Sequence, residues 1–147
     1  FYPDSDYNII ANEFNRMLFT LDRIGVKVFL ADEKYFPANF RGIYSTKRNN
    51  FYMNRSYMDD AATLIATMRH EGWHVAQDCI AGINNQELGL ILSEENIPEY
   101  VKEVVEEIYY DEPNQIPYEN GAFWASMKKG ATQYALDGCV LRQLNFD

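Results

Sequence analysis

The sequence is poor in basic residues, and it has no long apolar run. Its 147 residues include 13 Lys or Arg against 22 Asp or Glu, which gives a formal net charge of −9. Because a phosphate backbone is bound by clustered Lys and Arg, this balance argues against nucleic acid or an anionic membrane as a partner. No apolar run approaches the roughly 20 residues that span a bilayer. We therefore expect a soluble protein.

Cysteine is scarce as well. Cys79 and Cys139 are the only two cysteines, and such a sparse pair is more typical of buried free thiols in a reducing compartment than of a disulfide. We expect free thiols, with one disulfide as the alternative. Residues 1–6 lack the basic and apolar regions of a secretory signal. These observations favour a cytoplasmic location without fixing it.

Apolar and aromatic residues are abundant, at 47% and 15% of the chain. A chain of this length and composition can bury a core of its own and is not disordered. The sequence contains no internal repeat, low-complexity tract or linker that would divide it. We expect a single domain over residues 1–147, and the sequence leaves its oligomeric state open.

Hydrophobic periodicity predicts an α+β fold. Apolar residues spaced by three and four predict helices over residues 7–23, 56–82, 98–108 and 119–144, and a short helical piece around 87–92. Residues 26–30, 42–46 and 51–54 have strand composition, and the last two segments flank a polar turn suited to a hairpin. We predict a small twisted sheet of about three strands, packed on a mostly helical domain.

The two histidines of the chain are four residues apart, in the sequence His70-Glu71-Gly72-Trp73-His74. On a helix, positions i and i+4 share one face, so both imidazoles can bind one ion at about 2.0–2.1 Å with the Glu beside a coordinated water. The helical wheel turns both histidines away from the apolar stripe, as in the floor of a cleft. The pattern is the HExxH signature of zinc hydrolases. The alternative is a pair of ordinary surface or core histidines.

Two histidines leave a catalytic zinc ion one protein ligand short, because the fourth position holds water. Gln77 and Ile80 occupy the positions where an HExxHxxGxxH pattern needs Gly and a third His, so that pattern is excluded. We predict Glu119 as the third ligand, since it opens a helix after a proline-bounded loop and precedes small residues that allow close helix packing. The alternatives are Glu94, Glu95, Glu99 and Glu103.

With these residues the chain resembles the gluzincin metallopeptidases, in which a small twisted sheet precedes the HExxH helix and a later helix supplies a Glu. The resemblance covers the organisation of about residues 26–144, but only His70, Glu71 and His74 match a specific motif. In the family the third Glu usually stands directly before a small residue, whereas Glu119 lies two positions before Gly121. The resemblance implies a minimal zincin-like fold and a zinc peptidase that acts on peptide or protein substrates.

The same resemblance implies the roles of further residues. Glu71 would be the general base, and a tyrosine would stabilise the oxyanion because no histidine is left for that role. Tyr134 and Tyr118 are the candidates, from the helix that is predicted to carry Glu119. Asp78, one turn beyond the motif, is expected to be exposed rather than to orient a ligand.

Substrate binding is expected at the strand over residues 51–53, where zincins have an edge strand that pairs with an extended peptide. An ordinary sheet strand is an equally good interpretation of this segment. Trp73 and Trp124 would either pack near the site or form a side-chain pocket.

Two other classes of function remain open. The chain could be a non-catalytic zinc-binding structural or regulatory module, which would need a fourth protein ligand such as Cys139. It could also be an acidic interaction protein in which the HExxH pattern is a coincidence.

Overall fold

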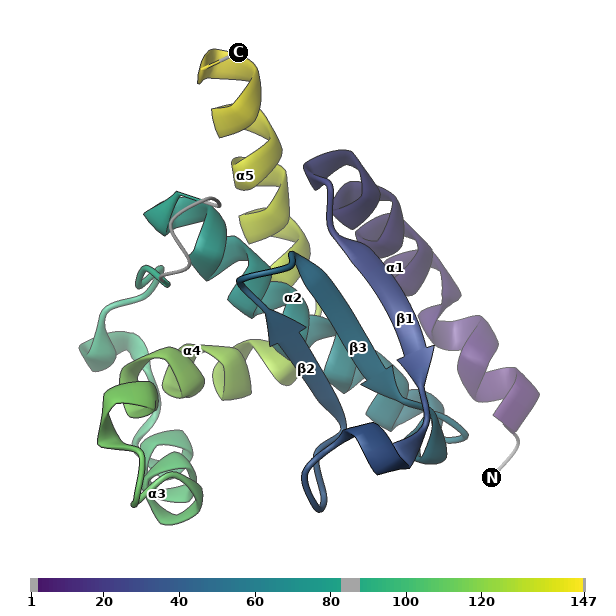
Figure 1. Cartoon of the computed structure of the whole chain (residues 1–147), viewed down its shortest axis with the longest axis horizontal. Coiled ribbons are helices and arrows are strands. Elements are labelled where there is room, and N and C mark those ends of the chain that lie inside the picture. The colour runs from purple at the N-terminus through teal and green to yellow at the C-terminus, as the bar shows by residue number, and fades with distance from the viewer. Residues whose placement is uncertain (1–2, 83–87, 147) are drawn as a thin grey trace.

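The computed structural model describes residues 3–82 and 88–146 (Figure 1). Within these residues the α+β prediction is confirmed, with five α-helices and one three-stranded sheet. None of the described helices is both long and apolar enough to cross a lipid bilayer. In chain order the elements are α1 (Pro3–Ile24), β1 (Lys27–Ala31), β2 (Gly42–Ser45), β3 (Asn50–Asn54), α2 (Ala61–Ala81), α3 (Glu99–Ile108), α4 (Ile116–Ser126) and α5 (Ala131–Phe146).

The sheet has the strand order β1-β3-β2, with β3 parallel to β1 and antiparallel to β2. The hairpin of β2 and β3 is therefore confirmed. The expectation that residues 51–53 form an edge strand is wrong, because β1 pairs along the other side of β3, with Val28 opposite Phe51. The edge strand beside α2 is instead β2 (Figure 1).

The main core lies where the sheet, α1, α2 and α5 meet. Phe51 and Met53 of β3 are buried against Met17 and Leu21 of α1, which are fully inaccessible to solvent. The apolar spacing of three and four in α1 produces this contact, since it places both residues on one helix face. Helix α1 ends as predicted, where Gly25 adopts a φ of 99° that few other residues tolerate.

The motif helix α2 crosses the centre of the molecule and contacts α1, α4, α5 and β2. It begins at Ala61, after Asp60, whose carboxylate accepts a hydrogen bond from the Ala62 N–H at 3.3 Å. Such a side-chain cap satisfies one of the free amides at a helix start. The helix ends at Gly82, as the sequence predicts, while residues 56–60 form a short 3₁₀ turn and bend rather than its first turn.

One continuous helix over residues 119–144 is not what the structure shows. The chain forms two helices, α4 and α5, separated by a turn that ends at Gly130 with a φ of 90°. An α-helix cannot continue through such a residue. The change of direction allows both α4 and α5 to pack on α2. Residues 88–92 of the expected short helix are also not helical, and residue 87 lies outside the described residues.

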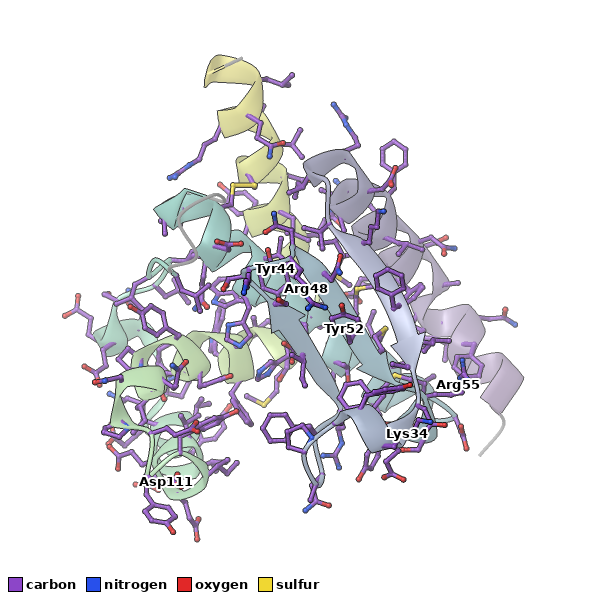
Figure 2. All side chains as sticks on the ribbon, viewed as in Figure 1. Lys34, Tyr44, Arg48, Tyr52, Arg55 and Asp111 are labelled. Atoms are coloured by element: carbon purple, nitrogen blue, oxygen red, sulfur yellow. A yellow bond between two sulfur atoms is a disulfide. The ribbon has the colours of Figure 1, made fainter. Side chains whose placement is uncertain are left out.

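The expectation of free thiols is wrong, because Cys79 of α2 and Cys139 of α5 form a disulfide (Figure 2). Their Cα atoms are 5.9 Å apart, within the usual span of such a bond. This proximity arises from the packing of α5 on α2 and is hidden in the sequence by a separation of 60 residues. Because the two cysteines are bonded to each other, they do not support the expectation of a reducing compartment.

Candidate metal centre and its cleft

Three side chains from two helices meet at one point above α2. His70 and His74 project from the same face of α2, with ring centroids 5.1 Å apart, and Glu119 reaches them from the first turn of α4. Glu119 Oε1 lies 3.2 Å from His70 Nε2 and 2.9 Å from His74 Nε2. The three residues predicted as metal ligands are therefore brought together.

The geometry of this group fits a metal ion. The possible ligand atoms of His70, His74 and Glu119 all lie within 4.8 Å of one another. Ligands about 2.05 Å from a tetrahedral zinc ion are separated by about 3.3 Å, close to the observed separations from Glu119. Two imidazole nitrogens and one carboxylate oxygen are also a donor set that zinc accepts in catalytic sites. The alternative ligands are exposed and lie outside the group; they are Glu94, Glu95, Glu99 and Glu103.

Small residues bring α4 close enough for Glu119 to reach the histidines. A Cβ atom on Gly121 would lie only 2.8 Å from Nε1 of Trp73 on α2. Ala122 and Ala125 on the same helix are completely buried. The structure thus agrees with the sequence argument that residues after Glu119 allow close helix packing.

Gln77 fixes the orientation of His74. Its Nε2 donates to the backbone carbonyl of Tyr118 at 3.1 Å, which leaves Oε1 to face His74 Nδ1 at 2.8 Å. Since an amide oxygen only accepts hydrogen bonds, Nδ1 must carry the proton and Nε2 is left to bind a cation. Gln77 is buried, and sequence reasoning assigned it no such role.

The charges around the histidines favour a cation at this point. Burial alone would lower the pKa of His74, but the Glu119 and Glu71 carboxylates raise it to about 9. Burial would raise the pKa of Glu119, yet His74 and His70 hold it far below its usual value. The carboxylates thus favour a positive charge at His74 Nε2, which is the atom that faces the candidate metal position.

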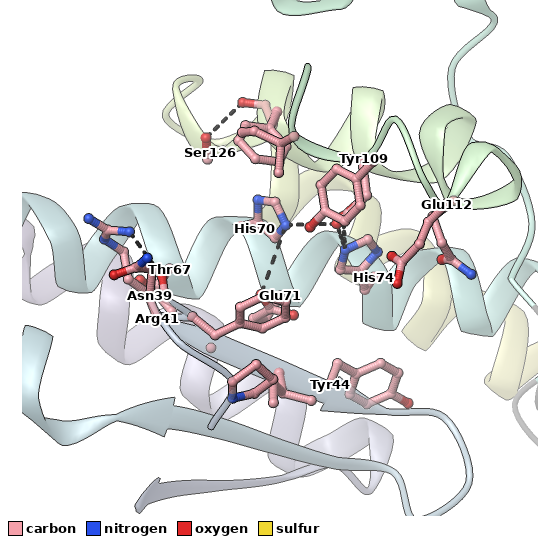
Figure 3. A pocket seen from close by; sticks show the side chains of 18 of the residues that line it. Asn39, Arg41, Tyr44, Thr67, His70, Glu71, His74, Tyr109, Glu112 and Ser126 are labelled. Carbon is pink, nitrogen blue, oxygen red and sulfur yellow. Dashed lines mark hydrogen bonds and ion pairs between the residues drawn. The ribbon is translucent and has the colours of Figure 1, made fainter. Parts of the chain in front are cut away.

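Glu71 faces the opposite wall of the cleft, toward the sheet (Figure 3). Burial raises the pKa of this carboxyl, and His70, His74 and a hydrogen bond from the Tyr44 backbone N–H offset the rise in part. Its Oε2 is 3.9 Å from His70 Nε2. The carboxyl group thus lies beside the candidate metal position without belonging to the ligand group.

The expectation that Asp78 is exposed is wrong, because β2 covers this part of α2. Asp78 is completely buried, and the Tyr44 hydroxyl donates to its Oδ2 at 2.6 Å. Burial raises the pKa of Asp78 to about 6, although the hydrogen bond from Tyr44 opposes the rise. Asp78 therefore fastens the edge strand to the motif helix.

The structure does not bring the predicted tyrosines into the cleft. Tyr134 points away on α5 with 83% of its surface exposed, so its prediction as the oxyanion residue is wrong. Tyr118 contributes its backbone carbonyl to Gln77, and its side chain does not line the cleft. Tyr109 lines it instead, at the end of α3, and its hydroxyl lies close enough to the Glu119 carboxylate for that group to raise its pKa. No spacing in the sequence distinguishes Tyr109 among 11 tyrosines.

A cleft of about 1340 Å³ runs over the metal position. Helix α2 forms its floor, β2 and the preceding loop 37–41 form one wall, and the ends of α3 and α4 form the other (Figure 3). The His70 and His74 side chains retain 16% and 13% exposure, so a small molecule can reach them. Trp73 and Trp124 do not line the cleft. Their rings pack edge to face, with ring centroids 5.7 Å apart.

The chain was compared with known protein families, curated proteins and solved structures. No family model, no curated protein and no solved structure matches the chain. Its function must therefore be inferred from the side chains of the cleft.

Proposed function

We propose that the chain is a zinc-dependent peptidase of the zincin type, with the gluzincin ligand set His70, His74 and Glu119. The observation that carries the proposal is the convergence of these three side chains at the floor of an open cleft, with a buried Glu71 beside them. A catalytic zinc site has three protein ligands and one open position, so three convergent side chains beside an open cleft support this proposal.

The chemistry that zinc supplies when bound is polarisation of the scissile carbonyl and acidification of a coordinated water. Glu71 acts as the general base, accepting the proton of the attacking water and passing it to the leaving amine. Burial raises the pKa of Glu71, which makes its carboxylate a stronger base than that of an exposed glutamate. Gln77 keeps His74 in the tautomer that this site requires.

Tyr109 takes the role that the sequence assigned to Tyr134. Burial raises the pKa of its hydroxyl, and the Glu119 and Glu71 carboxylates raise it further, so the group stays protonated and can donate a hydrogen bond. It lies on the wall opposite Glu71. A donor in this position stabilises negative charge on the substrate oxygen as water attacks from the other side.

The edge strand β2 is the proposed peptide-binding strand. The Asn54 N–H of β3 donates to the Arg41 carbonyl. In an antiparallel pair, the backbone N–H and C=O groups of successive residues point alternately toward the partner strand and away from it. The backbone groups of Gly42 and Tyr44 therefore point away from β3. An extended peptide can pair with their carbonyls by strand addition. The substrate class that fits is therefore an unfolded segment of polypeptide.

A non-catalytic zinc module is less well supported. Such a site needs a fourth protein ligand, and the part of the chain that the structure describes offers three residues to the ion. Cys139 cannot contribute because it is bonded to Cys79.

The proposal is tested by loading the purified chain with zinc and measuring bound metal and hydrolysis of a quenched fluorescent peptide library. We expect about one equivalent of zinc, with hydrolysis that a chelator abolishes and added zinc restores. Less than about a tenth of an equivalent at neutral pH would reject the metal site. Full zinc binding without hydrolysis of any peptide would reject the catalytic assignment.

A further inference from the structure

Strand β2 approaches Glu71 more closely than any side chain on Gly42 would allow. A Cβ atom on Gly42 would lie 2.7 Å from Thr67 Cγ2 and 2.9 Å from Glu71 Cγ. Real Cβ atoms do not approach other heavy atoms this closely. The absence of a side chain at position 42 therefore determines how near the edge strand lies to α2.

The close approach also turns a backbone amide of β2 toward Glu71. The Tyr44 N–H points away from β3, because the neighbouring positions of β2 are those that pair with the sheet. An outward amide on an edge strand normally bonds to solvent or to another chain. Here the Glu71 carboxyl group lies in front of it, and this backbone contact lowers the pKa of Glu71 against the effect of burial.

The Tyr44 side chain anchors the same residue to α2 at a second point. Its hydroxyl donates to Asp78 Oδ2 at 2.6 Å and lies 3.1 Å from Asn49 Oδ1 in the hairpin turn. Asp78 is fully buried and lies about two helical turns beyond Glu71. The Tyr44 side chain is therefore tied to the same helix that carries Glu71.

We infer that Gly42 and Tyr44 make β2 a positioning device for Glu71, in addition to any role of the strand in binding peptide. The strand holds the carboxylate in one orientation before substrate arrives. A misplacement of about 1 Å in a reacting group can lower a rate about 100-fold, so this orientation matters for catalysis. The kinetic part of the inference rests on the proposed function, whereas the structural part does not.

The structural part is tested by amide hydrogen exchange on the full chain. We expect the Tyr44 amide to be protected in the wild type and to exchange at least tenfold faster in Glu71→Ala. The Ile43 amide, which faces β3, should be unchanged in both proteins. Equal exchange of the Tyr44 amide in the wild type and Glu71→Ala would overturn the inference, whether or not the protein is an enzyme.

The kinetic part is tested with Gly42→Ala. We expect kcat to fall between about 10-fold and 100-fold, with zinc affinity within twofold of the wild type. Adding Thr67→Ser removes the methyl group nearest to the new Cβ atom and should recover part of the loss. Gly138→Ala is the matched control, because a Cβ atom there meets nothing within 4 Å.

These experiments separate two failures. An active wild type and an equally active, folded Gly42→Ala protein would reject the positioning role. A wild type without Glu71-dependent hydrolysis would reject the proposed function and leave the exchange measurement to decide the role of β2. If Gly42→Ala fails to fold, Tyr44→Phe replaces it; a tenfold lower kcat would support the inference, and an unchanged kcat would reject it.

Discussion

One buried glutamate faces each wall of the cleft, and the two carboxyl groups differ in their surroundings. Glu119 on the α4 wall faces both histidines, which lower its pKa. Glu71, on the α2 floor beside the β2 wall, faces a backbone amide, and burial raises its pKa. Similar burial is thus accompanied by a lowered pKa for Glu119 and a raised pKa for Glu71. This separation matches the proposed roles of Glu119 as a metal ligand and Glu71 as the general base.

Adjacent residues of α2 fasten the helix to the two walls. Gln77 binds the α4 wall through the Tyr118 carbonyl and orients His74. Asp78 binds the β2 wall through the Tyr44 hydroxyl. The comparison therefore predicts that changes at Glu119 and Gln77 act mainly on the metal, whereas changes at Glu71 act mainly on the chemical step.

The largest effect is expected for Glu71→Gln. The variant keeps the shape of the side chain but cannot accept a proton, so kcat should fall at least about 1000-fold, within the range for general-base catalysis. Zinc affinity should stay within a few-fold of the wild type. Measurement of both quantities on one preparation checks the assignment, and a strong loss of zinc would break the distinction between the walls.

Glu119→Ala is the reciprocal change. Removing a ligand should weaken zinc binding at least 100-fold, which is more than the loss seen when a residue behind a ligand is changed. Titration against a chelator of known affinity measures the loss. Unchanged affinity would show that another acid completes the site, and Glu103→Ala, at an exposed position, is the control.

Tyr109→Phe tests whether the α4 wall also contributes a hydrogen bond to the reaction. Loss of one donor to an oxyanion lowers kcat about 100-fold, with little change in zinc affinity or KM. Tyr134→Phe should have no effect because that residue is exposed on α5. Equal kcat values for the two variants would remove Tyr109 from the mechanism.

Asp78→Asn tests how the contact between α2 and the β2 wall affects folding stability. The pKa of Asp78 is about 6 in the folded protein against an ordinary value of 3.8. The folded state therefore binds more protons between pH 4 and 6, and this carboxyl destabilises the fold as the pH rises through that window. We therefore compare the free energy of unfolding of Asp78→Asn with that of the wild type. The variant should gain about 2 kcal/mol over the wild type between pH 4 and pH 7. Urea unfolding at each pH provides the measurement, and parallel pH profiles would contradict it.

The smallest effect is expected for Gln77→Met, which retains volume but removes the acceptor for His74 Nδ1. Changes of this kind lower metal affinity by about 10-fold to 100-fold, and we expect a value near the lower limit. Gln77→Glu keeps an acceptor and should retain most of the affinity. Equal affinities for Gln77→Met and the wild type would show that packing alone orients His74.

Local patterns predicted the parts of this structure that depend on neighbouring residues. The HExxH spacing identified His70, Glu71 and His74 as candidate site residues on one helix, because four residues make about one helical turn. The hairpin and most helices followed from periodicity. Glu119 could be proposed because the small residues after it imply close packing of its helix, which the Gly121 contact bears out.

Features that depend on long-range contacts could not be predicted in the same way. The central position of β3 arises from its parallel pairing with β1, which no turn between adjacent segments specifies. The burial of Asp78 and the disulfide both follow from elements that cover α2 from distant parts of the chain. Tyr109 reaches Glu119 only because α3 packs beside α4.

The Cys79–Cys139 bond has a further consequence for a chain proposed to cut polypeptides. The bond encloses α3, α4 and both loops around them in a covalent ring. A backbone cut anywhere inside this ring leaves the fragments linked, with Glu119 still tethered to the histidines on one side of the nick or the other. Nicked protein should therefore migrate as one species on a non-reducing gel and separate into two only after reduction.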